Sequence, residues 1–143
     1  MDWNEFSTPC YIVDEKKLKE NLMILRQLEQ DTGCHILLAQ KAFSMYALYP
    51  LIGNYISGTT ASGLFEARLG HEEMGKENHV FAPAYKEKDM AELVKLCDHI
   101  IFNSFAQYEK HRGTVAAWNS RAESVRTSER GSAPGKDAGA GAK

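Results

Sequence analysis

The sequence of 143 residues lacks the features of several protein classes. No stretch reaches the roughly 18 apolar residues that a membrane-spanning helix needs. The first five residues are acidic rather than basic, and no apolar segment follows them, so we do not expect a signal peptide. A formal net charge of -2 gives no electrostatic attraction for nucleic acid or for an anionic membrane. We therefore expect a cytoplasmic protein that binds neither.

Cysteine is scarce, and the histidines are scattered. Cys10, Cys34 and Cys97 are odd in number and form no CxxC pair, which predicts reduced thiols rather than disulfides. The five histidines show no metal-ligand spacing along the chain, and no HExxH, GxSxG or P-loop motif is present. We expect no metal site. The histidines at 35, 79 and 99 each open an expected strand, so we interpret them as structural or solvent-facing.

The sequence does contain an alternation of short apolar segments and helical patterns. Strands are expected over 10–13, 36–41, 56–61, 79–82 and 99–103. Helices are expected from Asp14, as N-cap, to Gly33, and then over 44–54, 64–74, 87–97 and 104–110, the last capped by Ser104. This order predicts an α/β fold with parallel pairing and right-handed crossovers. A doubly wound sheet is complete with four to six such units, whereas a (β/α)8 barrel needs eight.

The end of the chain differs in composition. Between residues 119 and 143, Val125 is the one side chain larger and more apolar than alanine. Such a segment buries too little surface to offset the entropy of ordering. We therefore predict a folded domain over 1–118 and a disordered tail over 119–143. A natural linker and a frame-shifted coding sequence both explain the change.

Lys41 ends the apolar run Ile36–Ala39 and is the candidate catalytic residue. The carboxyl ends of parallel strands are where ligands bind in α/β proteins. Alternation puts Leu37, Ala39 and Lys41 on one strand face. Burial there lowers a lysine pKa and favours the neutral amine that forms a Schiff base with an aldehyde. The alternative interpretation is a solvated lysine just past a strand.

Other polar residues follow the later strands. Ser62 is placed to cap the helix after the second barrel strand, with Glu66 one turn into it, and free N–H groups there suit an anion or a cofactor. Plain helix capping explains the same pattern. Tyr85 either lines a pocket or covers the barrel rim, and Asn103 either contacts ligand or supports its helix.

Several runs resemble the carboxynorspermidine/carboxyspermidine decarboxylases. The runs are residues 8–14 (TPCYIVD), 36–43 (ILLAQKAF), 58–70 (GTTASGLFEARLG), 82–86 (APAYK) and 101–105 (IFNSF). They occur in order over roughly residues 7–112. These enzymes belong to the alanine racemase-like, fold-type III group of pyridoxal-phosphate enzymes.

The resemblance implies the N-terminal half of a pyridoxal 5'-phosphate-binding (β/α)8 TIM barrel. The strand at 10–13 would belong to the C-terminal β-domain of the full-length enzyme, which works as a homodimer. Lys41 matches the lysine that binds the cofactor covalently, and Ser62 and Glu66 match a cofactor-pocket motif. The implied reaction is decarboxylation of carboxynorspermidine or carboxyspermidine to norspermidine or spermidine, in polyamine biosynthesis.

The sequence also departs from that family. The later strands, the Gly-rich phosphate loop and the acidic partner of the pyridinium nitrogen are absent, and residues from 119 onward resemble nothing in it. We therefore expect a fragment that is inactive alone and poorly folded or oligomeric, because a half barrel exposes strand edges and apolar surface. The alternatives are another fold-type III decarboxylase, for diaminopimelate or ornithine, a non-catalytic pyridoxal-phosphate-binding protein, or a fragment without function.

Overall fold

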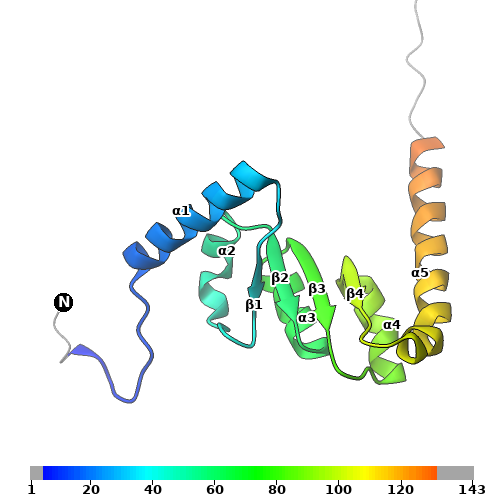
Figure 1. The fold of residues 1–143 in the computed structure, drawn as a ribbon, viewed down its shortest axis with the longest axis horizontal. Coiled ribbons are helices and arrows are strands. Elements are labelled where there is room, and N and C mark those ends of the chain that lie inside the picture. Colours follow the sequence, from blue (N-terminus) through cyan, green and yellow to red (C-terminus); the bar gives the residue numbers. More distant parts are fainter. Residues whose placement is uncertain (1–4, 132–143) are drawn as a thin grey trace, which may run out of the picture.

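The computed structural model describes residues 5–131, and Figure 1 shows their arrangement. Strands and helices alternate along the chain, as predicted. In order, the elements are α1 (Glu15–Thr32), β1 (Leu37–Ala39), the 3-10 helix η2 (Tyr46–Leu48), α2 (Tyr49–Ile52), β2 (Gly58–Ala61), α3 (Leu64–Glu73), β3 (Glu77–Phe81), α4 (Glu87–Leu96), β4 (His99–Ile101) and α5 (Phe105–Gly131). Within this range, none of the helices combines the length and the apolar character that crossing a membrane requires.

The four strands form one parallel sheet in the order β1-β2-β3-β4. Each strand pairs with the next strand in the sequence, with Ala39 beside Thr60 and Phe81 beside Ile101. In a doubly wound sheet the strand order reverses at a switch point. The uninterrupted order found here is that of a singly wound sheet, as in part of a (β/α) barrel. The predicted α/β class with parallel pairing is confirmed.

The two faces of the sheet differ in burial because the helices cover only one of them. Along β3, Val80 is fully buried, whereas its neighbour Phe81 points to the other face and is 45% exposed. On β4, Ile101 is 44% exposed on that same uncovered face. This alternation is what a strand with one packed face produces. We call the uncovered surface the inner face, since it would line the interior of a closed barrel.

Two apolar clusters lie on the covered face. One packs α1 and α2 against β1 around Leu22, Tyr49, Ile52 and Ile56. The other packs α3 and α4 against β2, β3 and β4, and Val115 and Trp118 attach α5 to it. The first cluster contains Leu18, Leu22 and Leu25 of α1, whereas Leu28 of the same helix is 48% exposed.

Helix α1 begins and ends where the sequence predicts. The side chain of Asp14 accepts a hydrogen bond from the backbone N–H of Lys17 at 3.1 Å. At the other end, Gly33 adopts φ +70° and donates its N–H to the carbonyl of Glu29. That left-handed conformation is accessible to glycine without steric cost.

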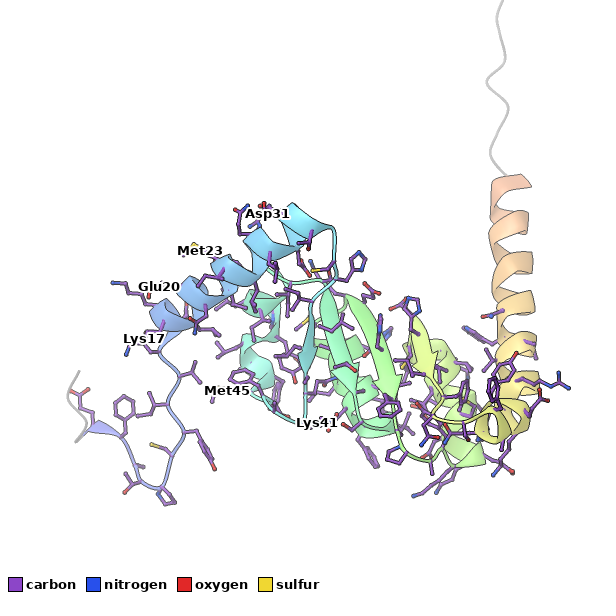
Figure 2. The ribbon with its side chains drawn as sticks, viewed as in Figure 1. Lys17, Glu20, Met23, Asp31, Lys41 and Met45 are labelled. Carbon is purple, nitrogen blue, oxygen red and sulfur yellow. The ribbon has the colours of Figure 1, made fainter. Side chains whose placement is uncertain are left out.

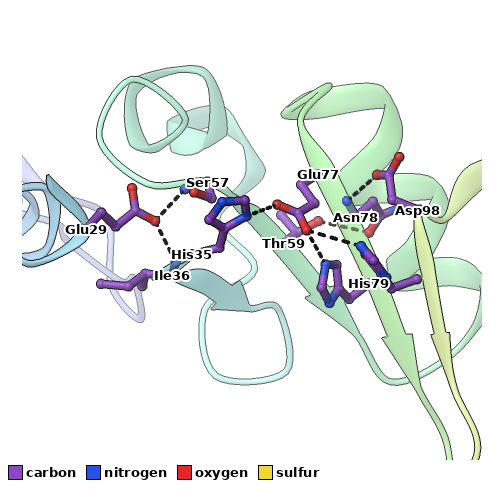
Figure 3. Close-up of polar contacts among 10 residues, drawn as sticks. Glu29, His35, Ile36, Ser57, Thr59, Glu77, Asn78, His79 and Asp98 are labelled. Atoms are coloured by element: carbon purple, nitrogen blue, oxygen red, sulfur yellow. Dashed lines mark hydrogen bonds and ion pairs between the residues drawn. The ribbon is translucent and has the colours of Figure 1, made fainter. Parts of the chain in front are cut away.

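Glu29 connects α1 to the sheet. Its Oε1 atom accepts the backbone N–H groups of Ile36 at 2.5 Å and Ser57 at 3.1 Å (Figure 3). These residues precede β1 and β2, so one carboxylate fixes the entry of two neighbouring strands. Partial burial raises the pKa of Glu29, but the two hydrogen bonds outweigh burial and leave this pKa below its usual range.

The strand expected over 10–13 is not formed, and that prediction is wrong for this chain. Residues 10–13 have no assigned strand, and Tyr11 is 95% exposed. A β-strand needs a partner for its backbone N–H and C=O groups. Within residues 5–131, the sheet contains only the four strands β1 to β4.

The helix expected over 44–54 is shorter and divided into two pieces. A 3-10 turn over Tyr46–Leu48 precedes the single α-helical turn Tyr49–Ile52, with Pro50 in its first turn. Proline cannot donate a backbone hydrogen bond, which costs nothing in the first turn of a helix but removes a hydrogen bond from a helix interior. Pro50 therefore begins a helix rather than continuing one.

Helix α5 is longer than predicted. Its first turn is capped as expected, because the Ser104 hydroxyl accepts the N–H of Gln107 at 3.2 Å. The helix was expected to end near Lys110, with disorder from residue 119, but its backbone continues to Gly131. Alanine, arginine and glutamate favour a helix even without tertiary contacts. The prediction of disorder considered apolar content and not this helix propensity. The division of the chain after residue 118 remains a prediction, and residues 132–143 lie outside the described part.

Candidate functional site at the carboxyl ends of the strands

The carboxyl ends of all four strands meet at one edge of the sheet because the strands are parallel. Lys41 follows β1 by two residues, Ser62 follows β2 directly, and Asn103 follows β4 by two residues. Figure 2 shows Lys41 at this edge, beyond the arrowhead of β1. The sequence-predicted residues are thus brought to the same end of the sheet, the end that binds ligands in α/β barrels.

Lys41 lies in a tight turn and not in the strand itself. The carbonyl of Ala39 accepts the N–H groups of Ala42 at 2.9 Å and Phe43 at 3.2 Å, so the chain bends immediately after β1. The side chain of Lys41 is exposed, which agrees with the alternative interpretation of a solvated lysine just past a strand and not with burial beside apolar neighbours. Nothing packs over the inner face at this point in the described structure. Among residues 5–119, no carboxylate forms an ion pair with the Lys41 amine.

Gln40 fixes the turn that carries Lys41. Its side chain is fully buried on the covered face, and its backbone N–H donates to Thr60 at 3.2 Å. The hydroxyl of Tyr49 donates to the Phe43 carbonyl at 3.2 Å and lies 3.4 Å from Oε1 of Gln40. The hydroxyl of Ser44 donates to the Gln40 carbonyl. Both sides of Lys41 are therefore held, while its own side chain is not.

The Gln40 side chain belongs to a buried polar layer between the sheet and α3. Thr59 donates its hydroxyl to Oδ1 of Asn78 at 3.0 Å, and the Asn78 amide donates to the Ala67 carbonyl at 2.8 Å. Gly70 of α3 lies directly over this layer: a Cβ there would stand 2.4 Å from Oγ1 of Thr59 and 2.8 Å from Nε2 of Gln40. That Nε2 atom has no hydrogen-bond partner among the described residues. The layer and the glycine together set how closely α3 approaches β2 and β3.

Ser62 and Glu66 are close to each other, but their contact differs from the predicted cap. Gly63 is the N-cap of α3 and supplies no side-chain hydrogen bond, so the expectation that Ser62 caps the helix is wrong. Instead, Oε2 of Glu66 accepts the backbone N–H of Ser62 at 2.7 Å. The helix begins one residue later than a Ser62 cap requires, which leaves the Ser62 side chain exposed.

The electrostatic environment of Tyr49 links the two strand ends. Burial raises the pKa of the Tyr49 hydroxyl, and the negative charge of Glu66 raises it further. A tyrosine hydroxyl is protonated at neutral pH even without this shift, and here it donates to the turn after β1. Glu66 of α3 thus acts on the group that holds the Lys41 turn.

Tyr85 and Asn103 connect strand ends, and Asn103 also lines a surface hollow together with Phe102 and Tyr108. Tyr85 is 7% exposed, and its hydroxyl lies 2.9 Å from the carbonyl of Ile101 while accepting the N–H of Ala82 at 3.1 Å. The Asn103 amide donates to the Pro83 carbonyl at 3.0 Å. For Tyr85 the structure supports the structural interpretation, whereas a ligand contact of Asn103 stays a prediction.

Gln40 and Tyr49 are the supporting residues that sequence reasoning did not identify. One signal was present: Gln40 shares its strand face with Ile36 and Leu38, and a polar residue on a buried face needs a partner. Tyr49 gave no comparable signal. It reaches Gln40 because η2 and α2 fold back beneath the strand end.

Comparison with known proteins shows which enzymes this chain resembles. The chain is 40% identical over 110 residues to the carboxynorspermidine/carboxyspermidine decarboxylase of Campylobacter jejuni, covering 77% of this chain and 29% of that enzyme. It is 39% identical over 108 residues to the carboxyaminopropylagmatine decarboxylase of Synechocystis, covering 76% of this chain and 28% of that enzyme. No family model matches the chain.

A solved structure gives the same correspondence. The crystal structure of carboxynorspermidine decarboxylase from Campylobacter jejuni, complexed with norspermidine, superposes with a TM-score of 0.76 at 39% identity. The match covers 78% of this chain and 30% of that one. The predicted resemblance to the carboxynorspermidine decarboxylases is therefore confirmed in sequence and in fold. The chain spans less than a third of the length of these relatives.

Proposed function

We propose that this chain is the lysine-bearing part of a pyridoxal-phosphate-dependent decarboxylase of carboxylated polyamines, with Lys41 as the attachment residue. The observation that supports it most directly is the 38–40% identity to three decarboxylases over at least 104 residues. All three are named for carboxylated polyamine substrates. The position of Lys41 at the ligand-binding edge of a barrel-type sheet agrees with this assignment.

The residues at this edge fit the attachment of an aldehyde cofactor. Lys41 offers an exposed primary amine without an acidic partner among residues 5–119. The turn around it is anchored by Gln40 and Tyr49, so the lysine backbone is fixed while the side chain can reach over the inner face. Ser62 has an exposed side chain at the neighbouring strand end, and its backbone N–H donates to the Glu66 carboxylate. These three side chains would contact the cofactor.

Bound pyridoxal phosphate supplies an aldehyde for attachment and a ring that accepts the electron pair released when a carboxylate leaves as carbon dioxide. The task of this chain is to position the lysine and the rim of the pocket. The inner face is open, with Phe81 and Ile101 each more than 40% exposed, so the described residues do not exclude water from the reacting centre. We therefore propose that the chain alone binds the cofactor but does not turn over substrate. We also propose that the whole enzyme acts as a homodimer.

Cofactor attachment can be tested on the chain itself. Substoichiometric pyridoxal phosphate, followed by borohydride reduction and peptide mass mapping, should label Lys41 ahead of the other lysines. Lys41→Arg should remove this label, whereas Lys95→Arg, which changes another surface lysine on α4, should leave it unchanged. Labelling spread evenly over the exposed lysines would contradict the assignment of Lys41.

Activity is best tested in a chimera, because this chain spans less than a third of its relatives. Residues 7–112 would replace the matching segment of the Campylobacter enzyme, and carbon dioxide release would be followed with carboxynorspermidine and carboxyspermidine. Both should be decarboxylated, and Lys41→Arg should abolish the reaction. An active chimera that is unaffected by Lys41→Arg would refute the role of Lys41. Robust turnover by the unaltered chain alone would refute its proposed inactivity.

A third substrate, carboxyaminopropylagmatine, should be included in that assay. The Synechocystis relative, named for carboxyaminopropylagmatine, is as similar to this chain as the enzymes named for carboxynorspermidine. The proposed class is therefore a polyamine chain that bears a carboxylate. Carboxyaminopropylagmatine turnover by the chimera above that of the parent enzyme would assign this preference to residues 7–112.

A further inference from the structure

A second cluster of polar residues lies on the inner face, toward the amino ends of the strands and away from Lys41. Glu77 and His79 are two residues apart on β3, so both point to the same face. His79 pairs in register with His99 of the neighbouring strand β4. Three potential metal ligands therefore converge although 20 residues separate the two histidines in the sequence.

The geometry of these three side chains is close to that of a metal site. Oε1 of Glu77 lies 2.7 Å from Nε2 of His79 (Figure 3). The same oxygen lies 3.5 Å from Nε2 of His99. All three ligand atoms lie within 4.8 Å of one another. In a tetrahedral zinc site, bonds near 2 Å place neighbouring ligand atoms about 3.3 Å apart. The observed separations lie on either side of that value, so small side-chain rotations would admit an ion.

A fourth residue orients the carboxylate. Nδ1 of His35 lies 2.6 Å from Oε2 of Glu77, the oxygen that does not face His79. Metal-binding carboxylates are characteristically held in this way by a hydrogen bond from an outer residue. His35 precedes β1, so the contact extends the cluster from β3 and β4 across the sheet to the first strand.

The cluster is anchored at two ligands and accessible at the third. The side chains of Glu77 and His79 are 21% and 19% exposed, whereas that of His99 is 62% exposed. The rings of His79 and His99 have centroids 4.4 Å apart at an angle of 48°, which leaves both Nε2 atoms directed toward Glu77 rather than stacked over each other. A surface hollow lined by His35, Glu77 and His99 gives an ion a path from solvent.

We propose that Glu77, His79 and His99 bind a divalent transition-metal ion, with zinc as the best match, and that His35 positions the Glu77 carboxylate. Two imidazoles and one carboxylate form a ligand set used by zinc, with the remaining position open to water. Imidazole nitrogen favours zinc, copper and nickel over magnesium or calcium, which prefer oxygen ligands. The bound ion would link β3 to β4 on the face that carries no helix.

The test uses the untagged chain without pyridoxal phosphate. Zinc binding by isothermal titration calorimetry should saturate at one ion per chain, and cobalt should give the visible absorption of a tetrahedral nitrogen and oxygen site. Zinc should also raise the midpoint of urea unfolding, because an ion that binds only the folded state stabilises it. Magnesium should produce neither effect.

Variants distinguish this site from adventitious binding. His35→Ala should weaken zinc by roughly 10–100-fold, as loss of an outer-shell partner does, and His99→Ala should weaken it further. Because His99 is mostly exposed, its replacement leaves the packed face intact, which circular dichroism would verify. His71→Ala removes another exposed histidine that lines the same hollow and should change nothing.

Three outcomes would overturn the proposal. The first is absence of saturable zinc binding by the unaltered chain. The second is unchanged affinity in a folded His99→Ala variant. The third is a sulfur-to-cobalt charge-transfer band, which would assign the metal to the exposed thiols of Cys10 and Cys34. In any of these cases the cluster would be a hydrogen-bonded network that serves the sheet alone.

Discussion

Replacing Gly70 by alanine tests how the buried polar layer sets the spacing between α3 and the sheet. The added Cβ would lie 2.4 Å from Oγ1 of Thr59, 2.8 Å from Nε2 of Gln40 and 3.1 Å from Oδ1 of Asn78. None of these three side chains is more than 1% exposed, so none can move into solvent to make room. The helix or the layer must shift.

The expected energy can be estimated from three contributions. Overpacking of a buried site costs about 1–3 kcal/mol. Loss of the Thr59–Asn78 hydrogen bond inside the layer costs a further 1–3 kcal/mol or so, because its partners stay buried. Alanine gains roughly 1 kcal/mol over glycine in a helix interior, which opposes both. We therefore expect Gly70→Ala to lower the free energy of unfolding by about 3 kcal/mol.

Gly113→Ala is the matched control. Gly113 also lies inside a helix, α5, but a Cβ there meets nothing within 4 Å. This variant should be as stable as the parent chain or up to about 1 kcal/mol more stable. Urea unfolding followed by circular dichroism would give the midpoint of each variant. An unchanged dependence of the free energy of unfolding on urea concentration would confirm that both unfold in a two-state manner. If Gly70→Ala proved as stable as Gly113→Ala, the layer would be loose and the account of how Gln40 is held would be wrong.

Three further predictions concern stability and reactivity. Asp14→Ala should lower the free energy of unfolding by about 1 kcal/mol through loss of the α1 N-cap, measured by urea unfolding. The pKa of Glu29 is lowered in the folded chain, so its carboxylate stabilises the fold at pH values above its unfolded pKa of ~4.3. The difference in the free energy of unfolding between the parent chain and Glu29→Ala should therefore shrink as pH falls through the folded pKa. A gap independent of pH would contradict this. Burial raises the pKa of Cys97 to about 12, so at pH 8 a chromogenic disulfide reagent should react promptly with Cys10 and Cys34, and with Cys97 only after denaturation. Three equal rates would refute it.

Some features of the candidate site were predictable because they depend on short-range patterns. Lys41 is the first charged residue after an apolar strand, and that pattern places it at the carboxyl end of β1 without knowledge of the other strands. The sequence left open whether this lysine is buried or solvated. Whether a side chain at a strand end is covered depends on what packs over the inner face, and here no described element does.

For Ser62 and Glu66 as well, one feature was predictable from the sequence and another was not. Their proximity follows from a spacing of four residues at the start of a helix. Which hydrogen-bond donor Glu66 contacts depends on where α3 begins. The helix begins at Leu64, whereas a Ser62 cap would require it to begin at Gly63. That choice depends on how α3 rests on the polar layer, which is a tertiary contact.

Residues far apart in the sequence gave no local signal. Glu77, His79 and His99 have no metal-like spacing along the chain, and only the register of β3 against β4 brings them within reach of one another. The strand expected at 10–13 failed for the related reason that strand formation needs a partner, whereas helix α5 extended past the expected end because helix propensity needs none.

The sequence by itself determined the alternation of strands and helices, both ends of α1, the position of Lys41 and the resemblance to the carboxynorspermidine decarboxylases. Each depends on periodicity, capping or short runs of residues, which are local properties. Only the tertiary structure decided the strand order, the burial of Gln40 beneath Gly70, the exposure of Lys41 and the meeting of Glu77 with two histidines. These depend on register and on the packing of helices against one face, and both arise between segments that are distant in the chain.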